Sequence, residues 1–412
     1  MVKRSYMTNS VVQKKQAQKF LRLIRETLNS YEYEPRRIVD LGTGDGVLAY
    51  ALKRTYPNSY VLGVDKDAEV LREGMNKWEG VEFLCRDILH LEFQQVFDLV
   101  VSSNTFHWLG KDWHKGVQKV WEMLEEGGWF FLHQGGRWTY HFLYDLAERI
   151  YTEMTGEVLK HTEVLFYPTL REFKKHLSKH FVVVSTFSDI EFQQDYSLKE
   201  LLKSFSVAGA RVFTDRLSPK QREEFLATLF ARAEEEEIPV FGRRLYGVMR
   251  KPLTVEVVPA RLEEVEFLIE KYEGEFVPPL SKRPSAGGGL EGGSLREYIK
   301  SLSSAKIFAA KKDGRVIGCL CYKMQALPFV SKPVPLVSTV IVEKPFRSAG
   351  VGRALYQKVL SENKELYVRT WSTNTNHLKL LKSLGFQEVY RIENHRGKGI
   401  DTVYWKYSHE RV

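Results

Sequence analysis

The chain has 412 residues, of which 43% are hydrophobic and 27% are charged. This length exceeds what one hydrophobic core usually holds, so we expect about two folded domains. No apolar run reaches the roughly 18 to 20 residues of a membrane-spanning helix, and the charged N-terminal stretch lacks the apolar core of a secretory signal. We therefore expect a cytoplasmic protein that does not span a membrane. Three cysteines are too few for a disulfide framework, and their spacing predicts no metal site.

The net charge of +9 is unevenly distributed along the chain. Residues 1–252 hold 36 Lys and Arg against 35 Asp and Glu, whereas residues 253–412 hold 25 against 17. A basic second part suits a polyphosphate cofactor or an acidic partner, although the same charges also serve solubility. This charge does not require a nucleic-acid partner, and we expect small-molecule substrates.

Strand-like apolar runs alternate with amphipathic stretches in the first part of the chain. The runs are "RRIVDLG", "YVLGVD", "VEFLCRD", "FDLVVSS" and "GGWFFLHQ". This rhythm predicts a parallel sheet covered by helices. From about residue 140 to 237 the pattern is mainly helical, before "GRRLYGVMRK" returns to strand character. Such a helical insertion near the end of the sheet could roof a pocket.

The pattern restarts after Lys251 and Pro252 with a strand, "LTVEVVPA", and a helix, "RLEEVEFLIEKYEG". We therefore expect a first domain over residues 1–252 and a second over residues 253–412. Within the second, "SAGGGLEGG" (285–293) is so rich in glycine that we expect a mobile loop.

The first glycine-rich motif, "VDLGTGDG" (39–46), follows a strand and precedes a helical run. This context distinguishes a ligand-binding loop from an ordinary turn, because glycine lets the backbone turn sharply and approach a ligand closely. Asp40 ends the strand, Asp65 ends the next strand about twenty residues on, and Asp87 ends the third. Asp65 suits two ribose hydroxyls, and Asp87 suits an adenine amino group.

Residues 35–135 resemble the class I methyltransferases that use S-adenosylmethionine. The resemblance implies a Rossmann-like α/β domain and S-adenosylmethionine as the cofactor. It implies a cofactor site made of Asp40, Gly42, Gly44, Gly46, Asp65, Asp87, Ile88 and Ser103.

The stretch after the fourth strand, "SSNTFHWLGKDW", is similar to the trans-aconitate and malonyl-carrier-protein methyltransferases. His107 stands where these relatives often have glutamine, so the resemblance does not identify the methyl acceptor of this chain. Enzymes that methylate base nitrogens usually have an Asn/Asp-Pro-Pro-aromatic turn here, and this chain has none. A carboxylate acceptor is anionic at neutral pH, so its methylation needs alignment and exclusion of water more than a strong base.

Arginine is the natural clamp for a carboxylate. The candidates are Arg137, just after the fifth strand, and Arg243 or Arg244 near the end of the domain, although each could be a solvated surface charge. His107 and Trp108 are further pocket candidates, while Trp108 could instead pack under the adenine. Tyr6 could close over the site or simply pack in the core.

The second glycine-rich motif, "FRSAGVG" (346–352), follows a β-branched strand and opens a helix. Backbone N–H groups and the helix dipole at such a position bind pyrophosphate, and Arg347 adds a cation. Residues 253–407 resemble the GNAT N-acetyltransferases, which implies acetyl-coenzyme A as the cofactor. "KIFAAKKDGRVIGCLCYKM" fits as a hairpin with an Asp-Gly turn. The implied cofactor residues are Val342, Arg347, Gly350, Val351, Gly352 and Asn374.

Leu381 stands where many relatives have the tyrosine that protonates the leaving thiolate. Another acid or a water must therefore protonate the thiolate, or it must leave without being protonated. Glu343 or His377 could take the proton from an ammonium substrate, although either could face solvent. Tyr404 is a candidate acid or a core tyrosine. Asp401 and His395 could bind a polar acceptor.

The two motifs together predict a bifunctional transferase that methylates a small acceptor, which we expect to carry a carboxylate, and acetylates an amine. In a second interpretation one domain binds its cofactor without catalysis and regulates the other. A third is modification of protein or RNA, which the basic second domain would suit.

Overall fold

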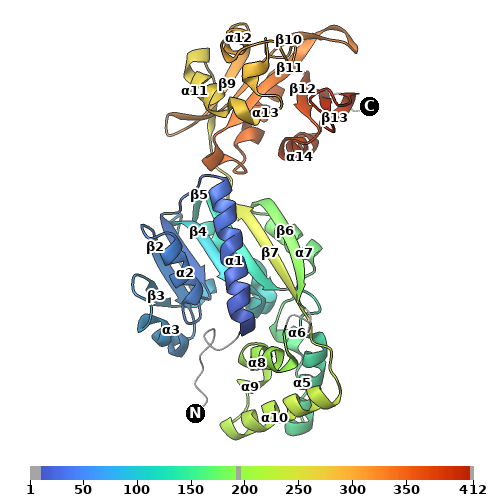
Figure 1. The fold of residues 1–412 in the computed structure, drawn as a ribbon. Helices are drawn as coiled ribbons and strands as arrows, with labels where there is room; N and C mark the ends of the chain where they lie inside the picture. The colour runs from blue at the N-terminus through green and yellow to red at the C-terminus, as the bar shows by residue number, and fades with distance from the viewer. Residues whose placement is uncertain (1–10, 192–195, 409–412) are drawn as a thin grey trace. The chain divides into compact units, whose positions relative to one another are not determined.

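The computed structural model describes residues 11–191 and 196–408. The chain separates into two compact units between Pro252 and Leu253. Each unit is built on a seven-stranded sheet (Figure 1). The predicted α/β class is therefore confirmed.

The sheet of the first unit has the order β3-β2-β1-β4-β5-β7-β6. Its five parallel strands run from the middle of the sheet to one edge. They are β1 (Arg37–Leu41), β2 (Tyr60–Asp65), β3 (Glu82–Cys85), β4 (Phe97–Ser103) and β5 (Leu124–Gly135). Two strands pair antiparallel beside β5, namely β7 (Gly242–Arg250) and β6 (Val182–Glu191). The strand β6 lies inside the stretch that the sequence predicted as mainly helical, so that prediction is wrong at this point.

Alternate residues of the parallel strands pack on opposite faces of the sheet, as the pleat of a strand requires. Val39 and Val100 join the core on one face, and Ile38 and Leu99 join the core on the other. Helices and short 3-10 turns cover these faces: α1 (Val11–Ser30), α2 (Val47–Thr55), α3 (Ala68–Met75), η1 (Ile88–His90), η2 (Phe106–Asp112) and α4 (Trp113–Met123).

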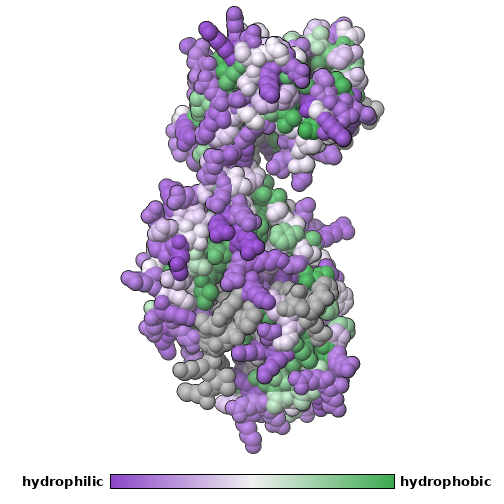
Figure 2. All heavy atoms as spheres, viewed as in Figure 1, coloured by the Kyte–Doolittle hydropathy of each residue, from purple (hydrophilic) through white to green (hydrophobic). Residues whose placement is uncertain are grey.

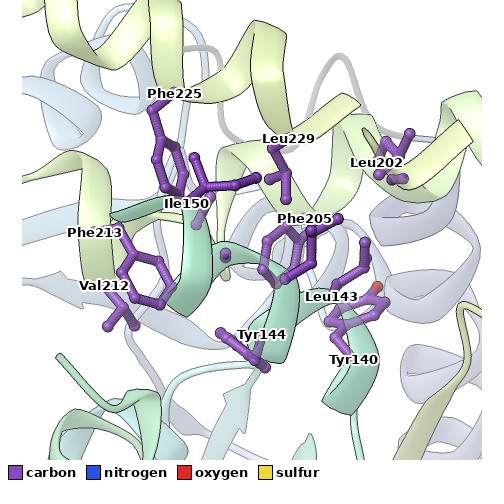
Figure 3. Close-up of a cluster of buried hydrophobic side chains, with 14 of the residues drawn as sticks. Tyr140, Leu143, Tyr144, Ile150, Leu202, Phe205, Val212, Phe213, Phe225 and Leu229 are labelled. Carbon is purple, nitrogen blue, oxygen red and sulfur yellow. The ribbon is translucent and has the colours of Figure 1, made fainter. Parts of the chain in front are cut away.

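The inserted segment after β5 forms further helices: α5 (His141–Thr155), α6 (His161–Val164), α7 (Leu170–Leu177), α8 (Leu198–Val207), α9 (Arg211–Thr214) and α10 (Pro219–Glu235). Capping boxes at Thr169, Ser197 and Ser218 start α7, α8 and α10, because each cap accepts from the backbone three residues on. Helices α5, α8, α9 and α10 gather at one end of the first sheet (Figure 1). Figure 3 shows that they enclose a hydrophobic core of their own, which includes Leu143, Ile150, Phe205, Phe213, Phe225 and Leu229.

The sheet of the second unit has the order β13-β14-β12-β11-β10-β9-β8. The strands are β8 (Glu256–Pro259), β9 (Lys306–Lys312), β10 (Arg315–Leu327), β11 (Val330–Val342), β12 (Glu365–Trp371), β13 (Gln387–Ile392) and β14 (Thr402–Ser408). Among the described strands of this sheet, only β11 and β12 pair in parallel, and they do so through two residue pairs, Leu336 with Tyr367 and Val337 with Val368. Beyond Val337 and Val368 these two strands no longer pair.

Helices of the second unit are α11 (Leu262–Tyr272), α12 (Leu295–Lys300), α13 (Val351–Glu362) and α14 (Thr375–Ser383), with short turns η4 (Glu273–Glu275), η5 (Leu280–Lys282) and η6 (Lys344–Phe346). The predicted hairpin joins β9 to β10 through Asp313 and Gly314, which both have positive φ. Two such residues make the turn that matches the twist of paired strands. Cys319 and Cys321 are buried free thiols on β10.

The glycine-rich segment 285–293, which the sequence predicts as a mobile loop, makes hydrogen bonds to residues outside it. Arg369 donates from Nη1 to the carbonyl oxygens of Gly287 and Gly288, at 2.9 and 2.7 Å. The N–H of Ala286 donates to Ser301 Oγ at 2.8 Å. These hydrogen bonds anchor residues 286–288, and the mobility of the segment stays a prediction.

Hydrophilic side chains cover most of the face drawn in Figure 2, and hydrophobic ones are gathered in smaller patches. Within residues 11–191 and 196–408, no helix is long and apolar enough to cross a membrane.

Candidate functional site

The first glycine loop is tightly packed at two glycines and open at the third. Gly42, Gly44 and Gly46 all have positive φ, at 73°, 59° and 80°. A Cβ atom on Gly42 would lie 2.1 Å from Thr105 Oγ1, and one on Gly46 would lie 2.6 Å from the Phe83 ring. A Cβ atom on Gly44 would meet nothing within 4 Å. The backbone at Gly44 is therefore open to close approach by a ligand.

Asp40 offers a buried acceptor directly before this loop. Its Oδ2 accepts a hydrogen bond from Thr43 Oγ1 at 2.8 Å, whereas its Oδ1 is buried without a partner. Burial raises the pKa of Asp40 to about 7; the Thr43 hydrogen bond opposes this shift, and the nearby Asp65 charge adds to it. A buried carboxylate oxygen without a donor suits a ligand that brings a cation or an N–H group.

The other two predicted acids cap backbone groups at the ends of their strands. Asp65 accepts from the N–H of Gly44 at 2.9 Å and from that of Asp67 at 3.0 Å. Asp87 accepts from the N–H of Leu89 at 2.8 Å and borders a surface pocket. A carboxylate has about four acceptor positions, so both acids keep capacity for ligand hydroxyl or amino groups.

Two other predicted cofactor residues turn their side chains into the protein. Ile88 is buried in the core beneath the sheet. Ser103 Oγ lies 2.9 Å from Nδ1 of His133, which is itself fully buried. The backbones of Ile88 and Ser103 are therefore the parts that a cofactor could contact.

His107 lies in η2, two residues beyond Thr105, whose hydroxyl donates to the Gly42 carbonyl oxygen at 3.2 Å. The ring stacks on Tyr167 with 5.2 Å between centroids, and its Nδ1 is buried without a hydrogen bond. Burial, and then the charge of Arg244, lower the pKa of His107 to about 3. His107 is therefore a neutral imidazole at neutral pH.

Arg244 is the buried cation of this region. It lies on β7 opposite Gly135, at the carboxyl end of β5, and only 5% of its surface is exposed. Its Nη2 donates to the hydroxyl of Tyr140 at 3.2 Å. Arg137, in contrast, is exposed beside the exposed Trp138. Of the arginines that the sequence offered as a clamp, Arg244 is buried and Arg137 is exposed, and the clamp role stays a prediction.

Sequence reasoning missed the tyrosines that surround Arg244 and His107. Tyr140 and Tyr144 belong to the start of α5, and Tyr167 follows α6. The hydroxyls of Tyr144 and Tyr167 are 3.1 Å apart. Burial raises the pKa of Tyr167 to about 12, so its hydroxyl stays protonated. These tyrosines follow no motif, and the only signal was the position of the insertion after β5.

The second glycine loop has the geometry of a helix start with open space before it. Gly350 has φ of 88° and is the N-cap of α13, and a Cβ atom there would meet nothing within 4 Å. A Cβ atom on Gly352 would lie 3.3 Å from Leu380. Val351 buries its side chain in the core. The first N–H groups of a helix have no partner within it, so this position suits an anion.

Arg347, which the sequence predicts as a cation at this loop, is held by two neighbours. Its Nη2 pairs with Glu275 at 2.8 Å, and its Nε donates to the carbonyl oxygen of Val342 at 2.8 Å. The guanidinium group therefore fixes the strand end and the loop that follows it.

Both predicted bases of the second unit are engaged by neighbours. Glu343 is 3% exposed and pairs with Arg315 at 2.7 Å and with Lys271 at 3.8 Å. His377 lies between the Tyr356 hydroxyl, 2.7 Å from Nε2, and Thr370 Oγ1, 3.1 Å from Nδ1. Burial lowers the pKa of His377 to about 4, so its ring is neutral at neutral pH.

The remaining candidates of the second unit contact neighbouring side chains. Tyr404 is 5% exposed and packs edge-on against Phe329, with 5.1 Å between ring centroids. Asp401 pairs with Arg391, and Nδ1 of His395 lies 3.0 Å from Thr402 Oγ1.

Three other sequence candidates complete the description. Nδ2 of Asn374 donates to Thr370 Oγ1 at 3.5 Å, and Trp108 packs against the insertion core. Tyr6 lies outside the described residues. Across the described ranges, no group of three His, Cys, Asp or Glu side chains is arranged to hold a metal ion.

Curated relatives are similar to the first unit. A malonyl-[acyl-carrier protein] O-methyltransferase from Bacillus cereus is 31% identical over 26% of this chain and 39% of its own length. One from Acetivibrio thermocellus is 27% identical over 50% of this chain and 74% of its own length. A trans-aconitate 2-methyltransferase from Rhodopseudomonas palustris is 33% identical over 23% of this chain and 37% of its own length. The chain thus spans well under half of two of these relatives.

Two solved structures are also similar. The N-methyltransferase NodS from Bradyrhizobium japonicum, in complex with S-adenosyl-L-homocysteine, aligns over 60% of this chain and 90% of its own, with 12% identity and a TM-score of 0.35. A sarcosine dimethylglycine methyltransferase described from Galdieria sulphuraria aligns over 57% and 86%, with 13% identity and a TM-score of 0.39.

Family models match both units. A methyltransferase domain matches residues 38–128, which hold the first glycine loop and the strands around it. The acetyltransferase (GNAT) family matches residues 272–386, which hold the second glycine loop. The chain therefore carries a methyltransferase domain followed by an acetyltransferase domain of the GNAT family.

Proposed function

We propose that the chain is a bifunctional transferase. In this proposal the first domain transfers a methyl group from S-adenosylmethionine to a small acceptor that carries a carboxylate. The second transfers an acetyl group from acetyl-coenzyme A to an amine. The two family matches support the reaction classes, and the local geometry supports the choice of donors and acceptors.

The residues of the first loop fit S-adenosylmethionine, which would supply an electrophilic methyl group. The orphan Oδ1 of Asp40 would accept from the cationic amino end of this donor, and the open backbone at Gly44 would lie along it. Asp65 and Asp87 would accept from the ribose and the adenine. Acetyl-coenzyme A would place its pyrophosphate at the start of α13 beside Gly350.

The burial of Arg244 is the observation that carries the carboxylate assignment. Arg244 lies among His107, Tyr140 and Tyr167 at the carboxyl end of the first sheet, and the loop through Gly42 contacts the same region through Thr105. His107 is neutral, so the guanidinium group supplies the positive charge there. A carboxylate oxygen needs no base to attack a methyl group, so binding, orientation and exclusion of water are the tasks that remain.

The acetyl acceptor must lose a proton before its nitrogen attacks. We propose that either His377 or Glu343 takes it. His377 is a neutral imidazole beside the hydroxyls of Tyr356 and Thr370. Glu343 is held by Arg315 and Lys271. The replacements His377→Gln and Glu343→Gln separate the two, because only loss of the base lowers kcat without a matching change in acetyl-coenzyme A affinity.

The test of the methyl acceptor compares arginines of the first domain in the full-length protein. Arg244→Gln should lower kcat/KM for carboxylate acceptors by about tenfold or more, because a hydrogen bond to a charged group contributes about 1.5 to 3 kcal/mol. S-adenosylmethionine affinity should stay unchanged in titration calorimetry. Arg137→Gln, and Arg171→Gln on the exposed face of α7, should behave like the wild type. Loss of activity in Arg137→Gln with full activity in Arg244→Gln would contradict the assignment.

A further inference from the structure

Three arginines from separate parts of the second domain converge on the segment between α11 and α12. Arg283 belongs to this segment, Arg369 lies on β12, and Arg396 lies between β13 and β14. Arg283 is 2% exposed and Arg396 is 8% exposed. Two of these three cations are thus almost entirely removed from solvent.

Hydrogen bonds hold the guanidinium groups of Arg283 and Arg396 at the carbonyl oxygens of two successive residues. Arg283 donates from Nε and Nη2 to the carbonyl oxygen of Pro278, at 3.0 and 2.6 Å. Arg396 donates from Nη1 to the carbonyl oxygen of Val277, the preceding residue, and from Nε to Thr402 Oγ1 at 2.9 Å. Arg369 holds the same segment further on, at Gly287 and Gly288.

The hydrogen-bond acceptors of these three groups are neutral oxygens, and Arg283 and Arg396 also lie over the rings of Phe276 and Trp371. Over the described part of the chain, no Asp or Glu forms an ion pair with Arg283, Arg369 or Arg396; the nearby Asp401 pairs with Arg391 instead. Burial, and then the charges of Arg283 and Arg369, lower the pKa of Arg396 to about 9. Buried cations without a counter-charge destabilise the folded protein, and a bound anion would remove this cost.

The arginine cluster, meaning Arg283, Arg369 and Arg396, borders the strands that lead to the second glycine loop. Arg369 directly follows Val368, the last residue of β12 that pairs with β11. On β11, the hydroxyl of Thr339 lies 2.7 Å from that of Tyr298. Burial raises the pKa of Tyr298, and the nearby charges of Arg283 and Arg369 oppose this shift. β11 then runs to Val342, from which the loop to Gly350 continues. The cluster therefore lies where β11 and β12 cease to pair. From this point β11 continues to the second glycine loop and α13.

We propose that Arg283, Arg369 and Arg396 bind a carboxylate or phosphate group of the amine that receives the acetyl group. This inference rests on the proposed acetyltransferase function and narrows its substrate to anionic amines, such as amino acids or aminoalkyl phosphates. The planar guanidinium fork suits both kinds of anion. A guanidinium has five N–H donors, and Arg369 donates to Gly287 and Gly288 through Nη1 alone, so it keeps donors for a ligand.

The test uses the full-length protein, acetyl-coenzyme A and matched pairs of amines. One pair is an α-amino acid and its carboxamide, and the other is an aminoalkyl phosphate and the corresponding amino alcohol. We expect kcat/KM for the anionic member of at least one pair to exceed that of its neutral member by about tenfold or more. The pair that shows the preference identifies the anion as carboxylate or phosphate.

Replacements then connect this preference to the cluster. Arg369→Gln should raise KM for the anionic member by about tenfold and leave the neutral member unchanged. Arg296→Gln, at an exposed position on α12, is the matched control and should change neither. Because Arg369 also holds Gly287 and Gly288, Arg369→Lys is measured beside it and should retain more of the preference than Arg369→Gln.

A binding experiment separates this inference from the acetyltransferase function. Equilibrium dialysis with labelled inorganic phosphate, in the presence of saturating coenzyme A, should show binding that Arg369→Gln weakens and Arg296→Gln does not. Equal rates on both members of every pair would overturn the anion site while acetyl transfer stands. Phosphate binding without transfer to any amine would support the anion site and contradict the acetyltransferase function. Phosphate binding that is the same in wild type and Arg369→Gln would overturn the inference.

Discussion

At the scale of single residues, Asp40 shows how a predicted cofactor residue differs from an ordinary surface acid. Its carboxylate is buried, with one oxygen bound to Thr43 and the other without a partner. Burial raises its pKa to about 7, so between roughly pH 4 and pH 7 the folded protein holds a proton there that the unfolded chain releases. The contribution of Asp40 to the free energy of unfolding therefore falls as pH rises from about 4 to about 7.

Replacement of Asp40 tests this dependence. In Asp40→Asn the side chain cannot ionise, so the free energy of unfolding relative to wild type should rise with pH, by up to about 1.4 kcal/mol per unit between pH 4 and pH 7. Urea unfolding of the full-length protein at several pH values measures it. Glu92→Gln, which replaces an exposed carboxylate of the same domain, should run parallel to the wild type. A constant difference between Asp40→Asn and wild type across this range would contradict the burial argument.

Single residues also mark the limit of what the sequence could predict. The glycines and acids of the two loops follow spacing patterns, so their places were predictable. Arg243 and Arg244 are neighbours on a strand, and neighbours point to opposite faces, so only the register of β7 on β5 decides which is buried. The ion pair of Arg347 with Glu275 depends on tertiary contacts that no local pattern encodes.

At the scale of elements, the first glycine loop joins β1 to α2 through a turn that side chains cannot fill. Gly44 and Gly46 share a left-handed backbone, but only Gly46 faces the Phe83 and Trp78 rings. Gly46→Ala should therefore lower the free energy of unfolding more than Gly44→Ala, by about 1 to 3 kcal/mol, since both share the strain of positive φ and differ in packing. Chemical unfolding of both variants measures the difference, and equal stabilities would contradict the described packing.

The elements also show where pattern reasoning succeeds. The five parallel strands and the Asp-Gly hairpin were predictable because local alternation and turn residues encode them. The strand β6 was missed although "VVVSTFSDIE" is rich in β-branched residues. Within the described residues it is an edge strand that pairs only with β7, about sixty residues later. Helices surround it in the sequence. The tyrosines around Arg244 come from the same insertion and depend on the same long-range packing.

At the scale of the whole molecule, the two domains have separate hydrophobic cores. Every buried hydrophobic cluster of the described residues lies wholly before Pro252 or wholly after it. Each domain can therefore be stabilised by its own donor. If one domain regulates the other, binding of its donor must change the stability or activity of the other domain.

Thermal unfolding of the full-length protein with each donor alone, and then with both, tests most directly that two donors bind two domains. A ligand that binds only the folded state stabilises it by about 2.7 kcal/mol at a hundred times its Kd. We expect two calorimetric transitions, of which S-adenosylmethionine raises one and acetyl-coenzyme A raises the other, with both raised when both donors are present. A donor that shifts neither transition, or both donors shifting the same one, would contradict the account.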